Sequence, residues 1–322
     1  NDPVWQAEKA KYSPNKNADN RNVRFRDWDN MQYWFRAVEK FAPWVNKVHF
    51  VTYGHLPKWL NTNNPKLNIA KHSDFIPKEY LPTFSSQPIE LNLHRIKGLA
   101  ERFVYFNDDM FLLRPVKREL FFAGKDCLPT DFAITSTIST TTKEDMMPFI
   151  KLNCVTILNG HFDKKEQMKK HFSKWVNLAY GWNALRNLIF YGQHRFKGFA
   201  NNHLAFSFLK SEYEDIWEKE YEALADTSSH KFRSKLDLDN WLIRYWQLTR
   251  GNFYPIGRHV KGKVYEIYNG VEQNQELFKV IENQTMPMIC INDNENVDFE
   301  PMKERIKQAF DKILPEKSSF EK

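Results

Sequence analysis

The sequence lacks the cysteine patterns that indicate a structural metal or a disulfide framework. Its 322 residues include three cysteines, Cys127, Cys154 and Cys290, which lie far apart and form no C-x-x-C pair. This spacing disfavours both a zinc knuckle and a disulfide-stabilised scaffold. We therefore expect three ordinary reduced thiols.

Long apolar runs are absent as well. The longest have about ten residues, whereas a membrane-spanning helix needs about 20. The opening residues, NDPVWQAEKAKY, have none of the features of a signal peptide. Hydrophobic residues nevertheless make up 42% of the chain, which is enough for a sizeable core in one large or two coupled domains. We expect a soluble, cytosolic protein.

Several widespread catalytic motifs are missing too. The chain has no G-x-G-x-x-G after a strand, no Walker A loop, no H-E-x-x-H and no G-x-S-x-G. These absences disfavour nicotinamide chemistry, P-loop ATP hydrolysis, zinc proteolysis and serine hydrolysis.

The chain is basic, with a formal net charge of +7 and a pI near 9.0. This charge favours an anionic partner such as a nucleotide, a phosphate-bearing polymer or a lipid surface. Because the basic residues are scattered among acidic ones and no nucleic-acid-binding module is recognisable, we expect no nucleic-acid partner. We interpret the basic run at 162–175, FDKKEQMKKHFSKW, as a solvated helix face, with polymer or membrane binding as the alternative.

Hydrophobic periodicity predicts alternating helices and strands in the first 130 or so residues. Helices are expected at 31–41 and 88–94, and strands at 47–52, 67–70 and 103–106. This alternation is typical of an α/β fold, here a Rossmann-like, mostly parallel sheet flanked by helices.

The second half has a different texture. After an expected strand at 131–138, amphipathic helices are predicted at 173–191, 211–226 and 237–248, and a strand at 286–292 with a helix at 299–313 returns to the sheet. We divide the chain into an α/β nucleotide-sugar-binding part (1–145), a mainly helical acceptor part that completes the active site (146–260) and a C-terminal part that returns to the core (261–322).

Two adjacent carboxylates, Asp108 and Asp109, follow the predicted strand at 103–106. Ligands of open α/β sheets bind at the carboxyl ends of strands. A charge beside an apolar strand is costly unless water or a cation meets it. Mg²⁺ commonly uses one or two protein carboxylates and fills its other positions with water and phosphates. The pair therefore indicates a metal and nucleotide-diphosphate site, with a solvated turn as the alternative.

Other candidates lie in three separate segments. Glu90 and His94 share one face of the predicted helix at 88–94, which could also be a solvated face. A loop ahead of the helix at 237–248 gathers His230, Lys231, Arg233 and Lys235, the best anion site of the second half or else a solvated basic loop. His203, just before the predicted helix at 211–226, is either a catalyst or a surface residue.

Several segments together resemble one family, the Stealth proteins, which include bacterial capsular polysaccharide phosphotransferases and the lysosomal-enzyme N-acetylglucosamine-1-phosphotransferase. The resemblance spans almost the whole chain in the family's order. It is carried by RFRDWDNMQYWFRAVEKFAPWVNKVHFVTYGHLPKWL, LPTFSSQPIELNLHRIKGL, FNDDMF, SSHKFRS and PEKSSFE.

The resemblance implies transfer of hexosamine-1-phosphate from a UDP-N-acetylhexosamine to a hydroxyl of an oligosaccharide or polysaccharide acceptor, with release of UMP. It also implies Mg²⁺ or Mn²⁺ as cofactor, and a location in the bacterial cytoplasm with peripheral membrane association as an open alternative. The residues that match the family's site are His203 as catalytic histidine, Asp108 and Asp109 as metal ligands, Arg233 as phosphate-binding residue, and Arg24, Asp27, Glu90 and Asp237 as cofactor-binding residues.

The chain departs from the family pattern in three places. Ala205 replaces a proline that often follows the histidine, and Asn30 occupies a position that is acidic in the family. The family also has a strand ending W-V-D-G before the point where this sequence begins, so we expect either a truncated sequence or an incomplete nucleotide site.

Three functions remain open from the residues alone. In the first, His203 acts as general base, or as covalent nucleophile, in sugar-1-phosphate transfer. In the second, the same site serves a metal-dependent glycosyltransferase that releases UDP. In the third, the chain binds polysaccharide or nucleotide without catalysis.

Overall fold

The structure is a computed structural model that describes residues 3–12, 26–140, 142 and 144–322. Within these residues the α-helices are α1 (Pro3–Tyr12), α2 (Met31–Phe41), α3 (His72–Phe75), α4 (Ser86–Leu91), α5 (Met147–His161), α6 (Lys164–Lys170), α7 (Phe172–Trp175), α8 (Asn183–Ile189), α9 (Lys210–Lys219), α10 (Tyr221–Ser229), α11 (Asn240–Thr249), α12 (Gln275–Glu282) and α13 (Phe299–Ile313). The strands are β1 (Val48–Thr52), β2 (Leu67–Lys71), β3 (Arg102–Tyr105), β4 (Met110–Leu112), β5 (Phe122–Ala123), β6 (Leu128–Asp131), β7 (Phe206–Leu209), β8 (Tyr254–Pro255), β9 (Gly262–Glu266) and β10 (Met288–Asn292).

The described strands form four small sheets, with the orders β1-β2, β4-β10-β9, β3-β7 and β5-β6-β8. The mixed α/β class is confirmed. The expected large, mostly parallel sheet is corrected, because β3 pairs antiparallel with β7 and β4 pairs antiparallel with β10. Periodicity marks where a strand lies but carries no information about a partner that is about a hundred residues away.

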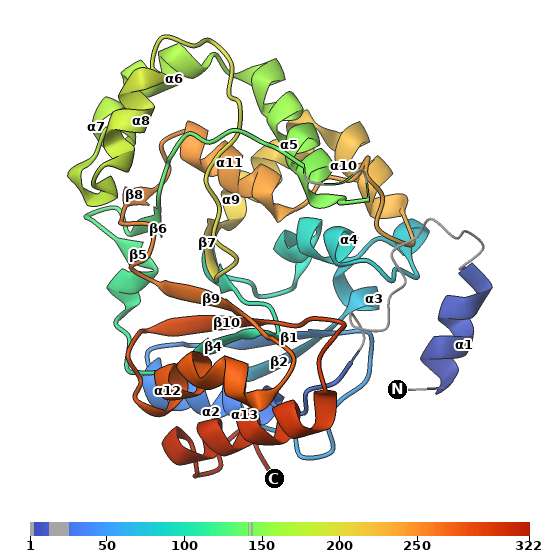
Figure 1. The fold of residues 1–322 in the computed structure, drawn as a ribbon. Helices are drawn as coiled ribbons and strands as arrows, with labels where there is room; N and C mark the ends of the chain where they lie inside the picture. Colours follow the sequence, from blue (N-terminus) through green and yellow to red (C-terminus); the bar gives the residue numbers. More distant parts are fainter. Residues whose placement is uncertain (1–2, 13–25, 141, 143) are drawn as a thin grey trace.

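The lower half of Figure 1 packs helices against the sheet β4-β10-β9. α13 supplies Met302, Ile306 and Phe310 at helical spacing, and all three are buried in the cluster that contains the strand residues Phe111 and Ile289. The helix and strand predicted at 299–313 and 286–292 are therefore confirmed, and they return to the core as expected.

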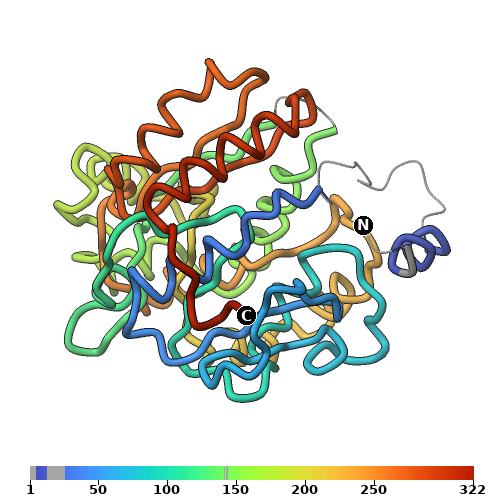
Figure 2. Tube along the Cα trace, turned by 90° about the horizontal axis from the view of Figure 1, so that it is seen from below, coloured from blue at the N-terminus to red at the C-terminus, as the bar shows by residue number. Residues whose placement is uncertain are grey.

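The end of the chain closes this lower half. Figure 2 shows the C-terminal segment next to chain from the first 60 or so residues. Glu321 forms a bridge with Leu60 and accepts two hydrogen bonds from Arg36 on α2, at 2.7 and 2.8 Å. The predicted helix at 31–41 and the strands at 47–52 and 67–70 are confirmed in this half.

The upper half is mainly helical, as predicted, and α11 lies at its centre with every residue buried. Arg244 of α11 is paired with Asp131 at the end of β6 through two hydrogen bonds of 2.8 Å. This fully hydrogen-bonded pair allows a guanidinium with no exposed surface to remain charged.

Three boundaries in this half were predicted wrongly. The segment 173–191 is divided among α7, a 3₁₀ turn and α8, because Gly181 adopts a φ of 55° that ends helical geometry. The segment 211–226 is split into α9 and α10 at Glu220. The strand predicted at 131–138 is irregular beyond Asp131, where β6 ends.

Each of the three cysteines is free, as predicted. Within the described residues, no helix has both the length and the apolar character that crossing a bilayer requires.

Candidate active site

The site forms where β3 ends and β7 begins. Tyr105 and Phe206 form the last pair of this antiparallel ladder, so the residues that follow β3 and those that precede β7 come together beyond it, among them Asp109 and His203. Asp108 and Asp109 lie in the turn between β3 and β4, at the carboxyl end of β3 as predicted. Antiparallel pairing of two distant segments therefore brings the predicted catalytic residues together.

Asp109 is the centre of this arrangement. Its Oδ2 atom lies 3.2 Å from His203 Nε2 and accepts a hydrogen bond of 3.2 Å from the thiol of Cys290. Its Oδ1 atom is buried and has no hydrogen-bond partner among the described residues. Because buried polar atoms are nearly always paired, this oxygen can receive a group that the described residues do not supply.

The donor atoms suit a hard cation. Asp109, His203 and Cys290 each place one ligand atom within 4.8 Å of the others, and Asp108 is exposed beside them. Burial raises the pKa of the Cys290 thiol far above its usual range, which favours the protonated form that donates to Asp109. Carboxylate oxygens are the ligands that Mg²⁺ prefers. The free oxygen of Asp109, together with Asp108, fits such an ion.

The surrounding charges favour the protonated form of His203. Burial lowers the pKa of its imidazole, but the hydrogen bond and charge of Asp109 outweigh burial, and the charges of Glu90 and Asp108 add to them. The net pKa of His203 is therefore raised. His203 is also 40% exposed at its side chain, so a substrate can reach it.

The pKa values of both neighbouring acids are raised as well, which favours their neutral forms. The pKa of Asp108 is raised, first because the protein groups packed around its carboxyl displace water although the residue stays exposed, and then by the charge of Asp109. The pKa of Glu90 on α4 is also raised by burial, and this is offset in part by the charge of Arg233 and by hydrogen bonds from Ser86 and Tyr105. Carboxylates gathered in one place against their mutual repulsion are typical of sites that receive a cation or a proton.

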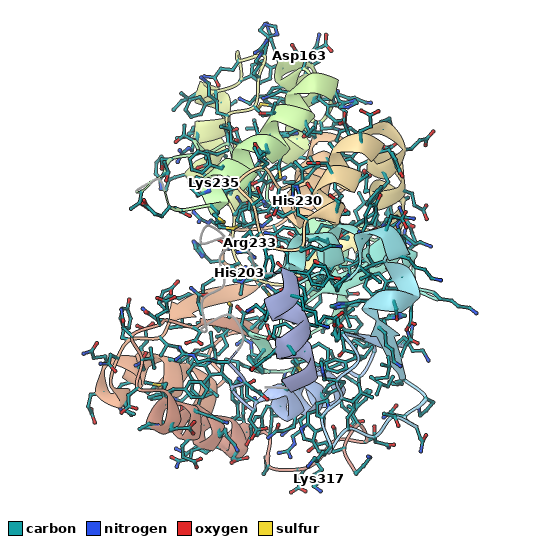
Figure 3. All side chains as sticks on the ribbon, turned by 90° about the vertical axis from the view of Figure 1, so that its right-hand side faces the viewer. Asp163, His203, His230, Arg233, Lys235 and Lys317 are labelled. Atoms are coloured by element: carbon teal, nitrogen blue, oxygen red, sulfur yellow. The ribbon has the colours of Figure 1, made fainter. Side chains whose placement is uncertain are left out.

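Arg233 connects this acidic group to the basic loop. Its Nη2 atom donates to Ser86 Oγ at 3.2 Å, and Ser86 in turn bonds to Glu90. Figure 3 shows Arg233 and His203 close in height, between the lower sheets and the upper helices. A guanidinium in this position suits binding of a phosphate, because its planar donors match phosphate oxygens.

Asp237 stabilises the loop that carries Arg233. Its side chain is fully enclosed, and it accepts hydrogen bonds of 2.6 Å from His230 Nδ1 and 2.7 Å from the backbone of Ser234. Both partners flank Arg233 in the sequence. The structure thus places Asp237 near the site as a support of the loop, with both of its oxygens engaged.

The family model for Stealth protein CR2, conserved region 2, matches residues 24–128. A capsular polysaccharide phosphotransferase WcwK of Streptococcus pneumoniae is 44% identical over 94% of this chain and 88% of its own. The chain belongs to the Stealth family. A receptor polysaccharide phosphotransferase WefC of Streptococcus gordonii is 39% identical over 100% of this chain and 96% of its own. An exopolysaccharide phosphotransferase cps2G of Lactiplantibacillus plantarum is 38% identical over 100% and 93%.

The matched region of this Stealth protein contains the acidic part of the site. It includes Asp27, whose charge further raises the pKa of Asp108, and whose Oδ1 accepts a hydrogen bond from the backbone of Asp29 at 2.7 Å. Neighbouring Arg26 is fixed to Asp293, beyond the end of β10, by hydrogen bonds of 2.6 and 3.0 Å. The predicted residue Arg24 lies outside the described residues. His203 and Arg233 lie outside the matched region.

Two candidate residues of this Stealth protein, His94 and Lys235, have surroundings other than the site. His94 is buried between Tyr213 and Trp217, and burial lowers the pKa of its imidazole to about 3, as for a core residue. Lys235 lies over the ring of Phe149, 4.8 Å from its centroid. Sequence reasoning also missed Cys290, Ser86 and Tyr105, for which no motif gave a signal.

A basic recess adjoins the His203 segment of this Stealth protein. It has a volume of about 20 Å³, enough for a single polar group, and its lining includes Asn202, Arg258 and Lys261. Lys261 donates to Ser207 at 3.2 Å, and Arg258 donates to Asn202 at 2.9 Å. Burial lowers the pKa of Lys261 to about 8, although Asp131 opposes this. Neither cation has a carboxylate in hydrogen-bond contact among the described residues.

Proposed function

We propose that this protein is a capsular or exopolysaccharide phosphotransferase. It moves hexosamine-1-phosphate from a UDP-N-acetylhexosamine to a hydroxyl of an oligosaccharide or polysaccharide acceptor, and it releases UMP. The observation that carries the proposal is the meeting of His203 with Asp108 and Asp109 in a chain whose relatives, matched over most of its length, are named polysaccharide phosphotransferases.

The reaction forms one bond and breaks one. The acceptor oxygen attacks the phosphorus that carries the sugar, and the bond from this phosphorus to the bridging oxygen breaks, so that UMP leaves with that oxygen. The product is a phosphodiester. Such transfers depend on positioning and charge stabilisation more than on covalent chemistry by the protein.

His203 is the proposed base, and its Nε2 atom is the one that lies beside Asp109. It takes the proton of the acceptor hydroxyl as the new oxygen–phosphorus bond forms. The carboxylate of Asp109 stabilises the imidazolium that results, just as it raises the pKa of His203 in the free protein. Proton uptake is therefore favoured by the charges already in the site.

Arg233 is the proposed contact for the charged phosphate oxygens. Its link to Ser86 fixes its position beside the acidic residues. Asp108 and the free oxygen of Asp109 would hold Mg²⁺ or Mn²⁺, which when bound supplies positive charge that neutralises a diphosphate. Asp27 and Arg24 belong to the matched region and are proposed to contact the nucleotide.

The experiment that tests the proposal identifies the nucleotide that is released. The protein is incubated with UDP-N-acetylglucosamine, Mg²⁺ and an acidic capsule-type oligosaccharide, and the nucleotides are separated by chromatography. We expect UMP to accumulate in step with consumed donor. Release of UDP would assign the site to glycosyl transfer, and no turnover with any UDP-N-acetylhexosamine would leave only binding.

A matched pair of variants connects this reaction to the site. Asp109→Asn keeps size and shape but removes the charge, and we expect a loss of UMP formation of about 10²-fold or more. Asp311→Asn changes an acid that accepts a hydrogen bond from Tyr33, remote in sequence from every site residue, and should retain activity. Equal activity in the two variants would contradict the role of Asp109.

A further inference from the structure

The segment from α7 through α8 exposes the residues that a folded protein normally buries. Leu178, Trp182 and Ile189 are 97%, 87% and 77% exposed, and Leu185 and Leu188 are 47% and 42% exposed. Single exposed apolar residues are ordinary, but a group of this size within 12 residues is not. We call these five residues the apolar tip.

Helix α8 turns the polar residue Asn187 toward the protein interior and its apolar residues toward solvent. Asn187 is the buried residue of α8, and it donates 2.5 Å hydrogen bonds to the carbonyl oxygens of Ala133 and Trp175 and accepts one of 2.8 Å from the backbone of Thr135. Trp182, Leu185 and Ile189 are spaced by three and four residues and therefore share a face. The polar side of α8 is anchored, so the outward position of its apolar side is built into the structure.

The chain segment that contains the apolar tip carries side-chain charge of one sign. From Gln167 to Ser211 the sequence has no acidic residue, and between 167 and 200 it has six basic ones. Five of these are exposed: Lys169, Lys170, Arg186, Arg195 and Lys197. The nearest acids in the sequence are Glu166 and Asp163, and Asp163 is already paired with His194 at 2.6 Å.

The apolar tip lies at one end of the molecule. In Figure 1, α6, α7 and α8 form the upper left extremity, at the opposite end from α12, α13 and the C-terminus. α7 contacts α6 and β8, and α8 contacts the 3₁₀ turn at Leu178–Tyr180. The exposed side chains of the apolar tip leave its outer side open to a large flat partner.

We propose that the apolar tip and its basic surroundings bind the surface of a membrane that contains anionic phospholipids. Trp182, Leu178 and Ile189 enter the boundary between headgroups and acyl chains, and the lysine and arginine side chains contact lipid phosphates. Within the described residues no helix can span the bilayer, so this attachment is peripheral. The inference concerns a surface apart from the catalytic residues and does not depend on the proposed reaction.

Charge and chemistry favour lipid over other occupants. A second copy of the chain, placed on this surface by a two-fold axis, would bring two basic patches together without a compensating acid. A sugar polymer would find a tryptophan but mostly leucine and isoleucine, which offer it no hydrogen bonds. An anionic bilayer matches both the apolar side chains and the positive charge.

Vesicle flotation tests the proposal with the full chain. Vesicles of phosphatidylcholine with phosphatidylglycerol are compared with vesicles of phosphatidylcholine alone, using wild type and the double variant Trp182→Ser, Ile189→Ser. We expect wild type to float with the anionic vesicles, high salt to weaken this, and the variant to lose about tenfold or more of its binding. The control, Leu56→Ser with Tyr268→Ser, removes two exposed apolar residues elsewhere and should bind like wild type.

Three results would overturn the proposal. Wild type could fail to float with anionic vesicles, or the Trp182→Ser, Ile189→Ser variant could float as well as wild type. Sedimentation could also show a wild-type dimer that this variant abolishes, which would assign the apolar tip to a second copy. Because the substituted side chains are exposed, unchanged thermal melting of the variant will show that lost binding is not lost folding.

Discussion

At the scale of single residues, the proposed function depends on how the carboxylate of Asp109 acts on its neighbours. The carboxylate has one oxygen shared by His203 and Cys290 and one oxygen that has no hydrogen-bond partner in the part of the chain that the structure describes. The first keeps the imidazole oriented, and the second is available to a cation. One side chain thus joins the proposed base to the proposed metal site.

Removing the charge of Asp109 should lower the pKa of His203. In wild type this pKa lies above 6.5, because the effect of Asp109, with help from Glu90 and Asp108, exceeds the opposing effect of burial. In Asp109→Asn the hydrogen-bond geometry can persist, but the charge is gone, and the imidazole loses its proton at a lower pH. The measurement is an NMR titration of the His203 ring, assigned by comparison with His203→Gln.

The same shift predicts pH effects on rate and stability. On the acidic side of the pH profile, kcat/KM should rise as His203 loses its proton. The apparent pKa of this rise should lie above 6.5 in wild type and should be lower in Asp109→Asn. The stabilisation from the His203–Asp109 contact should be complete below pH 6.5 and be lost as the pH rises through the folded pKa of His203. An unchanged titration in the variant would contradict the electrostatic account of the site.

Asp239 predicts a second pH effect, of the same sign. Burial raises the pKa of its carboxyl to about 7, although its side chain also accepts the first hydrogen bond of α11 from Trp241. Between about pH 4 and 7 the folded state then holds a proton that the unfolded state has lost, so stability falls as pH rises. Asn caps helices without this charge.

Chemical denaturation of Asp239→Asn at pH 5 and pH 8 checks this effect. We expect the free energy of unfolding of the variant, relative to that of wild type, to increase by more than about 1 kcal/mol from pH 5 to pH 8. An equal difference from wild type at both values would show that the carboxyl does not titrate in this range.

At the scale of elements, the site depends on strands that approach closely. Gly262, at the start of β9, has a φ of 151°, and a Cβ atom there would lie 1.8 Å from the carbonyl oxygen of Met288 on β10. No side chain can occupy that space without separating the two strands. β10 carries Cys290 into the site, so this separation would also disturb Asp109.

Gly262→Ala should therefore destabilise the fold by about 3 kcal/mol or more, which thermal or denaturant unfolding can measure. Gly54→Ala is the matched control, because its φ of 142° is similar but a Cβ atom there meets nothing within 4 Å. Its cost should be limited to backbone strain of about 1–2 kcal/mol. Equal losses would show that the close contact with Met288 is unimportant.

The elements also show how far the sequence could predict the site. Periodicity found β1, β2, β3, β10, α2 and α13, and placed Asp108 and Asp109 at the end of a strand. It could not find that β7 pairs with β3, because strand partners are chosen by packing between segments distant in the chain. The link between His203 and Asp109 was therefore available only as a family resemblance.

Residues that belong to no recognisable motif could not be predicted as part of the site, for a related reason. Cys290 reads as one apolar position of a buried strand, and only the pairing of β10 with β4 brings its thiol to Asp109. Lys261 reads as one of many scattered lysines, yet it lies in a recess whose lining includes Asn202, the neighbour of His203.

At the scale of the whole molecule, the two proposed functional surfaces differ in charge. The proposed catalytic residues His203 and Arg233 lie between the lower sheets and the upper helices, and the apolar tip lies at the far end of the upper half. A polysaccharide phosphotransferase attached through this tip would keep its acidic site away from the anionic bilayer surface. The separation predicts that variants of one surface leave the other intact.

The recess with Lys261 and Arg258 predicts how the molecule receives an anionic substrate. Lys261→Met keeps the aliphatic stem and removes the charge, and we expect KM for the donor or the acceptor to rise about tenfold with a smaller change in kcat. The substrate whose KM rises is the one that places an anionic group near the recess. Unchanged KM for both would remove the recess from substrate binding.

The fate of the sugar-bearing phosphorus tests the central claim most directly. A UDP-N-acetylhexosamine donor labelled with ³²P in the phosphate next to the sugar is incubated with the protein, Mg²⁺ and acceptor, and the label is followed after separation of glycan from nucleotide. Sugar-1-phosphate transfer predicts label in the glycan and unlabelled UMP. Label that stays in UDP would mean attack at carbon and would contradict the account.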